Sequence, residues 1–164
     1  IGSIVMISLC LAGSIFFTPF LTKYSAKLML CMGYFGMSIF FFAAFLSWML
    51  GANSYLLIFF LGAYLFVFQA GPGPQPWVII MDTYSLEQRL AAQGFFTFLN
   101  WSANALVAIV YMWISGPLDF YVSLIFGSIN LFTFFFLWIF MINATGKTHI
   151  ELMREYQKKI PIFN

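Results

Sequence analysis

Charged residues are scarce in this sequence. Only 7% of the 164 residues are Asp, Glu, Lys or Arg, whereas about 25% is usual for a soluble domain. The chain is also 63% hydrophobic, and a single core of this length could not bury so many apolar side chains. Segments of about ten residues with alternating polarity, typical of membrane β-barrels, are lacking as well. The composition therefore predicts an all-α polytopic membrane protein.

Residue combinations that carry catalysis or bind metals are equally scarce. Cys10 and Cys31 fall in different apolar runs and lack the spacing of a metal or redox motif, so we expect them to pack as small apolar residues. The sequence offers no Ser-His-Asp set and no phosphate-binding loop, and its few charges lie mostly between apolar runs. We expect no enzyme, no cofactor or metal site, and no nucleic-acid partner.

Long apolar runs are what the sequence has instead. A helix needs roughly 20 apolar residues to cross a bilayer. Five such runs occur, at about residues 1–20, 28–50, 55–81, 90–115 and 120–142. The chain thus divides into a transmembrane bundle over residues 1–143 and a polar C-terminal tail over residues 144–164.

The basic residues indicate how the bundle is oriented. All of them follow the first, third or fifth run, so five spans place them on one side of the membrane: Lys23, Lys27, Arg89, Lys147, Arg154, Lys158 and Lys159. The positive-inside rule makes that side the cytoplasm. We expect a multi-pass protein of the plasma membrane with a cytoplasmic C-terminus. Because the chain begins inside an apolar run without Met, we also expect a fragment of a longer protein.

Uncharged polar side chains mark one face of the fourth run. Gln93, Thr97, Asn100 and Asn104 follow at intervals of four, three and four residues, which places them on one side of a helix. Such amides can simply bond neighbouring helices, each contact contributing about 0.6 kcal/mol. A stripe of four, with a tryptophan beside it, favours the lining of a site or pathway instead.

The third run is interrupted by the stretch GPGPQPW, residues 71–77. Pro72, Pro74 and Pro76 have no N–H for the carbonyl four residues earlier, the first being that of Phe68. Free carbonyls are tolerated in a membrane only inside the protein or beside water. We expect a helix break that faces the bundle interior, since broken helices often form transporter sites. A static proline kink is the alternative.

Together these residues resemble the sugar porter branch of the major facilitator superfamily, and most closely its animal glucose transporters. The resemblance rests on the GPGPQPW stretch, on Asp82, Tyr84 and Arg89 after it, and on the pair Asn100-Trp101. It implies that the chain corresponds to helices eight to twelve of a twelve-helix transporter. The N-terminal half of such a transporter would then be a partner that this chain lacks.

The resemblance also implies roles for individual residues. The sugar-binding residues would be Gln69, Trp77, Asn100 and Trp101, with neighbours Phe68 and Asn104, and the gating break would comprise Gly71, Pro72, Gly73, Pro74 and Pro76. Amides exchange hydrogen bonds with hydroxyl groups, and an indole can cover the apolar face of a pyranose ring.

Three positions depart from the pattern of the family. Gln69 stands where animal glucose transporters carry Glu, so the preferred substrate can differ. Cys10 lies near the family's asparagine of helix eight, and we assign it no role. In the family, cytoplasmic charges latch the two halves together; Lys23, Asp82 and Arg89 would serve here, although Thr22 replaces the usual acid and weakens the latch.

The sequence thus predicts the C-terminal part of a monosaccharide transporter, with a hexose as the expected substrate. It would work by alternating access about a site at mid-depth of the bilayer, either as a uniporter or coupled to protons. Two alternatives stay open. One is a transporter of another neutral polar solute such as a polyol, and the other is a non-transporting sensor or scaffold.

Overall fold

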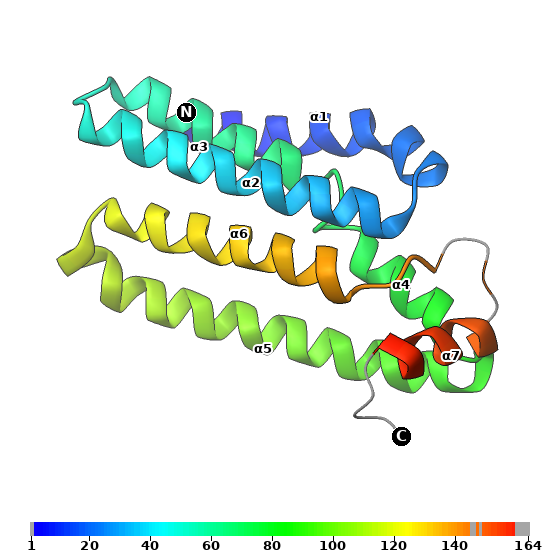
Figure 1. Ribbon diagram of the computed structural model, residues 1–164. Coiled ribbons are helices and arrows are strands. Elements are labelled where there is room, and N and C mark those ends of the chain that lie inside the picture. Colours follow the sequence, from blue (N-terminus) through cyan, green and yellow to red (C-terminus); the bar gives the residue numbers. More distant parts are fainter. Residues whose placement is uncertain (1, 145–146, 148, 160–164) are drawn as a thin grey trace.

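The computed structural model describes the chain except for residues 1, 145–146, 148 and 160–164. Within the described residues every regular element is a helix (Figure 1). The helices are α1 (Gly2–Lys23), α2 (Ala26–Met49), α3 (Ser54–Phe68), α4 (Gln75–Thr83), α5 (Leu86–Leu118), α6 (Tyr121–Phe140) and α7 (His149–Lys159). The predicted all-helical class is confirmed.

The number of full-length spans differs from the sequence-based expectation. In the described part of the chain, α1, α2, α5 and α6 are long and apolar enough to cross a membrane. The expected third span is divided into α3, with 15 residues, and α4, with 9. The expected break in the apolar run over residues 55–81 lies between Phe68 and Gln75, where the chain leaves the α-helix.

The helix ends follow local chemistry. The Ser25 hydroxyl accepts a hydrogen bond from the Leu28 N–H at 3.3 Å, and the Asn53 side-chain oxygen accepts one from the Tyr55 N–H at 3.2 Å. Both are typical helix N-caps. The fourth span does not end before Gly116 as expected, since α5 continues to Leu118. A proline in the last turn removes only one hydrogen bond, so Pro117 does not end the helix.

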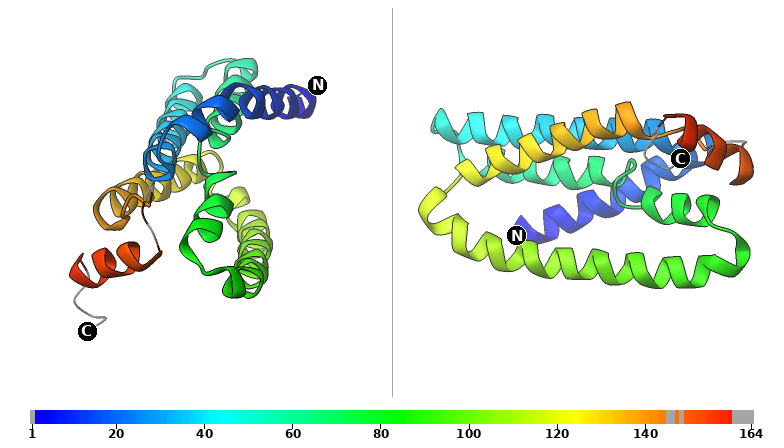
Figure 2. Two further views of the ribbon diagram at one scale, coloured as in Figure 1. Left: turned by 90° about the vertical axis from the view of Figure 1, so that its right-hand side faces the viewer. Right: turned by 60° about the horizontal axis from the view of Figure 1, so that its bottom comes forward.

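The core of the bundle is built around α2. This helix packs on α3 and on α6, and α1 packs on α3 from the other side. Cys31, Ser38 and Ala44 of α2 are almost completely buried. In contrast, α5 makes few contacts with α4 and α6, and Figure 2 shows it apart from α1, α2 and α3, with α4 between them.

The polar tail is more ordered than the sequence predicts. It contains the amphipathic helix α7, whose Leu152 is buried, and the Tyr156 hydroxyl accepts a hydrogen bond from the Ile142 N–H at 3.3 Å. Residues 145–146, 148 and 160–164 of the expected tail lie outside the described residues. Figure 1 shows α7 at the end of the bundle that holds α4, beside the start of α5.

Candidate functional site

The break between α3 and α4 packs tightly against α2. A Cβ atom at Gly71 would lie 2.2 Å from the main-chain oxygen of Met29, and one at Gly33 would lie 2.1 Å from the Pro72 ring. Only glycine fits at these two positions, because the space is filled by main chain and by a rigid ring. The break is thus held against the buried centre of the bundle.

The backbone at the break recovers part of the hydrogen bonding that its prolines remove. The Gly73 N–H donates to the Phe68 carbonyl at 2.9 Å, and the Gln75 N–H donates to the Gly71 carbonyl at 2.9 Å. The expectation that the Phe68 carbonyl loses its partner was therefore wrong. Since Pro72 cannot donate, the next available N–H takes its place by a wider turn.

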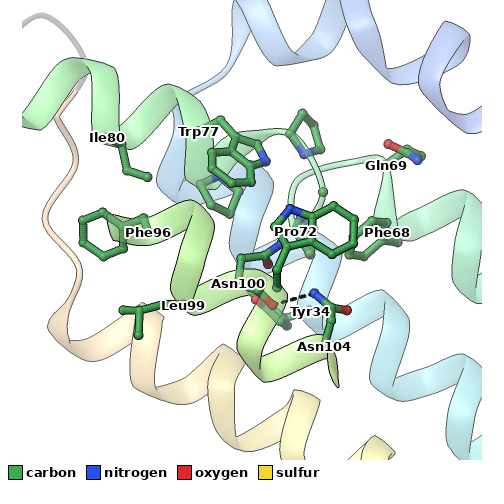
Figure 3. A pocket seen from close by; sticks show the side chains of 14 residues that line it. Tyr34, Phe68, Gln69, Pro72, Trp77, Ile80, Phe96, Leu99, Asn100 and Asn104 are labelled. Atoms are coloured by element: carbon green, nitrogen blue, oxygen red, sulfur yellow. Dashed lines mark hydrogen bonds between the residues drawn. The ribbon is translucent and has the colours of Figure 1, made fainter. Parts of the chain in front are cut away.

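A pocket of about 880 Å³ opens between this break and α5. Aromatic rings, amides and prolines line it (Figure 3): Tyr34, Phe68, Gln69, Pro72, Gly73, Pro74, Pro76, Trp77, Ile80, Phe96, Leu99, Asn100, Trp101 and Asn104. None of these residues carries a formal charge. The pocket thus offers hydrogen bonds and flat apolar surfaces, which suits a neutral ligand with both hydroxyl groups and C–H faces.

The structure brings the predicted binding residues together. All six line this pocket: Phe68, Gln69, Trp77, Asn100, Trp101 and Asn104. Four of the five predicted break residues line it too, the exception being Gly71, which is buried against α2. Of the polar stripe on α5, Asn100 and Asn104 reach the pocket, whereas Gln93 and Thr97 do not.

Hydrogen bonds orient two of the pocket amides. The Gln69 Nε2 donates to the Cys10 Sγ of α1 at 2.9 Å, and the Asn104 Nδ2 donates to the Asn100 main-chain oxygen at 2.8 Å. The nitrogen and the oxygen of an amide group point in different directions. Each hydrogen bond therefore turns the side-chain oxygen away from the atom that accepts the bond. Figure 3 shows Gln69 on the far side of the pocket from Asn100.

The α5 wall of the pocket is open. No residue of α5 is buried, and Trp101 is 69% exposed, whereas Trp77 of α4 is 36% exposed. Exposed amides on a membrane helix need water, a ligand or protein beside them, since hydrocarbon cannot satisfy them. The polar wall of α5 is therefore suited to face an aqueous cavity.

Several lining residues were not singled out from the sequence. Tyr34, Ile80, Phe96 and Leu99 belong to apolar runs in which nothing distinguishes them from lipid-facing neighbours. Cys10 was assigned no role, yet it contacts Gln69 directly. No local signal in the sequence could have found this pair, because the two residues are 59 positions apart.

The expected charge latch is only partly visible. Lys23 ends α1, and its ammonium lies 5.9 Å from the centre of the Tyr24 ring. The Arg89 Nε donates to the Tyr84 carbonyl at 3.1 Å, which ties the start of α5 to the end of α4. Asp82 belongs to α4, but its side chain lies outside the described residues. The latch stays a prediction.

Comparison with known proteins gives one family. The model of the family described as "Sugar (and other) transporter" matches residues 1–156. Facilitated glucose transporter member 2 of Sus scrofa is 33% identical over 98 residues, 58% of this chain and 19% of that protein. Facilitated glucose transporter protein 1 of Caenorhabditis elegans is 28% identical over 106 residues, 65% and 21% of the two chains. The chain spans about a fifth of the length of these relatives.

A solved structure has the same fold. The inward-open structure of the xylose transporter XylE from E. coli superposes with a TM-score of 0.83 at 21% sequence identity. The superposition covers 94% of this chain and 35% of that one. The family model matches nearly the whole chain, and the glucose transporters and the fold agree with it. The chain belongs to the sugar (and other) transporter family, the sugar porters of the major facilitator superfamily.

Proposed function

We propose that this chain forms the C-terminal part of a monosaccharide transporter and that the pocket between α4 and α5 is its sugar site. The observation that carries the proposal is the composition of that pocket. Gln69, Asn100 and Asn104 supply amides, Trp77 and Trp101 supply aromatic faces, and none of the described lining residues is charged. Amides pair with sugar hydroxyls, and indoles cover the C–H face of a pyranose.

The size of the pocket and the names of the proteins related to this chain favour a hexose as the substrate. The volume of about 880 Å³ lies within the range of small-molecule sites and leaves room for further walls. Several relatives are named as facilitated glucose transporters. The remaining walls would come from the N-terminal half of the transporter, which is the partner that this chain requires. Uniport and proton coupling both fit this arrangement.

The mechanism we propose is alternating access about a site at mid-depth of the bilayer. The break leaves α4 joined to α3 by residues 69–74 only, so α4 can tilt without unfolding α3. Arg89 and Tyr84 link α4 to α5, which lets the two pocket walls move together. Lys23, Asp82 and Arg89 would stabilise one state from the cytoplasmic side, at the plasma membrane.

Sugar uptake by the full-length protein tests the site. We expect Trp77→Ala and Asn100→Ala to lower glucose uptake by at least about tenfold, because each removes a group that contacts the sugar. Gln93→Ala is the matched control, since Gln93 lies on the same helix as Asn100 but outside the pocket. Uptake at the control level in both pocket variants, with normal surface expression, would refute the site assignment.

A transporter of another neutral solute is the second candidate, and the uncharged pocket supports it equally. A polyol offers the same hydroxyl groups without a rigid ring for the indoles to cover. Competition separates the two, because excess sorbitol should leave glucose uptake unchanged if the substrate is a hexose. A sensor or scaffold would show no uptake of either compound, although it could still bind sugar.

A further inference from the structure

A second pocket lies at the end of the bundle where α2 begins and α6 ends. Its volume is about 430 Å³. Residues of α2, of the α6–α7 connection and of α7 line it: Lys27, Met141, Ile142, Asn143, Lys147, Glu155, Lys158 and Lys159. We call it the lysine pocket. Among the described residues, none lines both this pocket and the proposed sugar site.

The charges of the lysine pocket are unbalanced. Its described lining contains four lysines and a single carboxylate. That carboxylate, on Glu155, already pairs with Lys147 at 2.5 Å. Lys27, Lys158 and Lys159 therefore add three positive charges that no acid of the described lining compensates. Like charges held close together repel, and a bound anion would remove that repulsion.

Lys27 is fixed in position at this pocket. Its Nζ donates to the Trp138 main-chain oxygen at 2.9 Å and lies 5.8 Å from the centre of the Trp138 ring. These contacts engage one of the three N–H donors of an ammonium, so the others stay available. The charge is thus placed between α2 and α6.

The position in the fold indicates which anion can reach the pocket. Lys27 lies in the first turn of the span α2, and Met141 directly follows the last residue of the span α6. Both spans end here, so the pocket lies at the level where the hydrocarbon gives way to phospholipid headgroups. Trp138 and Tyr156 lie beside it, and both residue types favour that interface.

We propose that the lysine pocket binds a phosphate-bearing anion, and that a phospholipid headgroup is its natural source. Ammonium groups make strong charge-assisted hydrogen bonds to phosphate oxygens. Basic pockets between membrane helices are suited to anionic headgroups. The lipid would join α2, α6 and α7 and so stabilise α7 against the end of the bundle. This inference does not depend on the sugar site.

Binding to the purified full-length protein in neutral detergent tests the proposal. The probes are a short-chain phosphatidic acid and, separately, inorganic phosphate, with zwitterionic phosphatidylcholine of the same chain length as the reference without net charge. We expect phosphatidic acid to bind saturably. The variants are the single substitution Lys27→Gln and the double substitution Lys158→Gln with Lys159→Gln. We expect the affinity for phosphatidic acid to fall about fivefold for each lysine that is removed.

Arg154→Gln is the matched control, because Arg154 lies on the same helix as Lys158 and carries the same charge but does not line the pocket. We expect this variant to bind phosphatidic acid within about twofold of the unchanged protein. An equal loss of affinity in the two single variants Arg154→Gln and Lys27→Gln would overturn the pocket in favour of diffuse attraction. Binding of inorganic phosphate but not of phosphatidic acid would overturn the headgroup as source. Absence of binding to both would overturn the site itself.

Discussion

At the scale of single residues, the contact with Cys10 orients Gln69, one of the amides of the proposed sugar site. The thiol accepts the amide hydrogen at 2.9 Å and holds the side chain in one orientation. A free glutamine could turn its nitrogen or its oxygen toward a ligand. The bond to α1 leaves the oxygen available to accept a hydrogen bond from a sugar hydroxyl in the proposed site.

Substitution of Cys10 should therefore change sugar affinity without removing any sugar contact. We expect Cys10→Ala to raise KM for glucose by about 2- to 12-fold with a smaller change in kcat, since one hydrogen bond contributes about 0.5–1.5 kcal/mol. Steady-state uptake by the full-length protein gives both constants. Cys10→Ser should restore KM, because its hydroxyl also accepts a hydrogen bond.

Two outcomes would contradict this role for Cys10. If Cys10→Ser raises KM as much as Cys10→Ala, the thiol acts through packing and not through the hydrogen bond. If neither variant changes KM, Gln69 does not depend on α1 for its orientation. Cys31→Ala serves as the control for loss of a thiol, since Cys31 is buried in α2 and lines neither pocket.

Sequence alone could identify one side of this contact. Gln69 and Asn100 are polar residues within apolar runs, and helical periodicity with the family resemblance indicated both. A cysteine in an apolar helix carries no comparable signal. Its contact with Gln69 depends on how α1 packs on α3, which no pattern within either helix specifies.

At the scale of elements, the break between α3 and α4 depends on close packing with α2. The prolines explain why the helix stops, but not where the loose segment lies. Its position is set by Gly71, which meets the main chain of Met29, and by Pro72, which meets Gly33. The break is thus anchored against α2, and it is the point about which α4 would tilt in the proposed mechanism.

Filling this contact should destabilise the protein. We expect Gly71→Ala to lower the free energy of unfolding by about 1–3 kcal/mol, because the added methyl group would overlap the Met29 carbonyl and force the helices apart. Thermal unfolding of the full-length protein in detergent measures the change. Gly116→Ala is the control, since a Cβ there meets nothing within 4 Å.

A contrary result would be equal melting temperatures for Gly71→Ala and the unchanged protein. That would mean that the break does not press against α2. Destabilisation by Gly116→Ala to the same degree would mean that glycine itself, and not the contact with Met29, is what the fold requires. Alanine in a helix is otherwise favoured over glycine by about 1 kcal/mol, so this control should be neutral or stabilising.

The elements were predictable where local signals are strong. Long apolar runs gave α1, α2 and α6 almost in full, and three prolines gave the position of the break. The C-terminal end of α5 was misjudged because Gly116 and Pro117 favour a stop, while the last helical turn tolerates both. The helix α7 was missed because its polar composition resembles that of an unstructured tail.

At the scale of the whole molecule, the helices divide into a packed group and a loosely attached wall. The group contains α1, α2, α3 and α6, whereas α5 has no buried residue. The proposed sugar site lies between them, with Gln69 and Trp77 on one side and Asn100 on the other. Movement of α4 and α5 together relative to the packed group would change the shape of such a site, as the proposed alternating access requires.

Sugar binding to the full-length protein tests the central claim most directly, because it needs no transport. We expect purified protein to bind D-glucose saturably in isothermal titration and to bind L-glucose much more weakly. Asn100→Ala should lower the affinity by at least about tenfold, while Gln93→Ala should leave it unchanged. Glucose binding of equal strength in Asn100→Ala and Gln93→Ala would contradict the claim that this pocket is the sugar site.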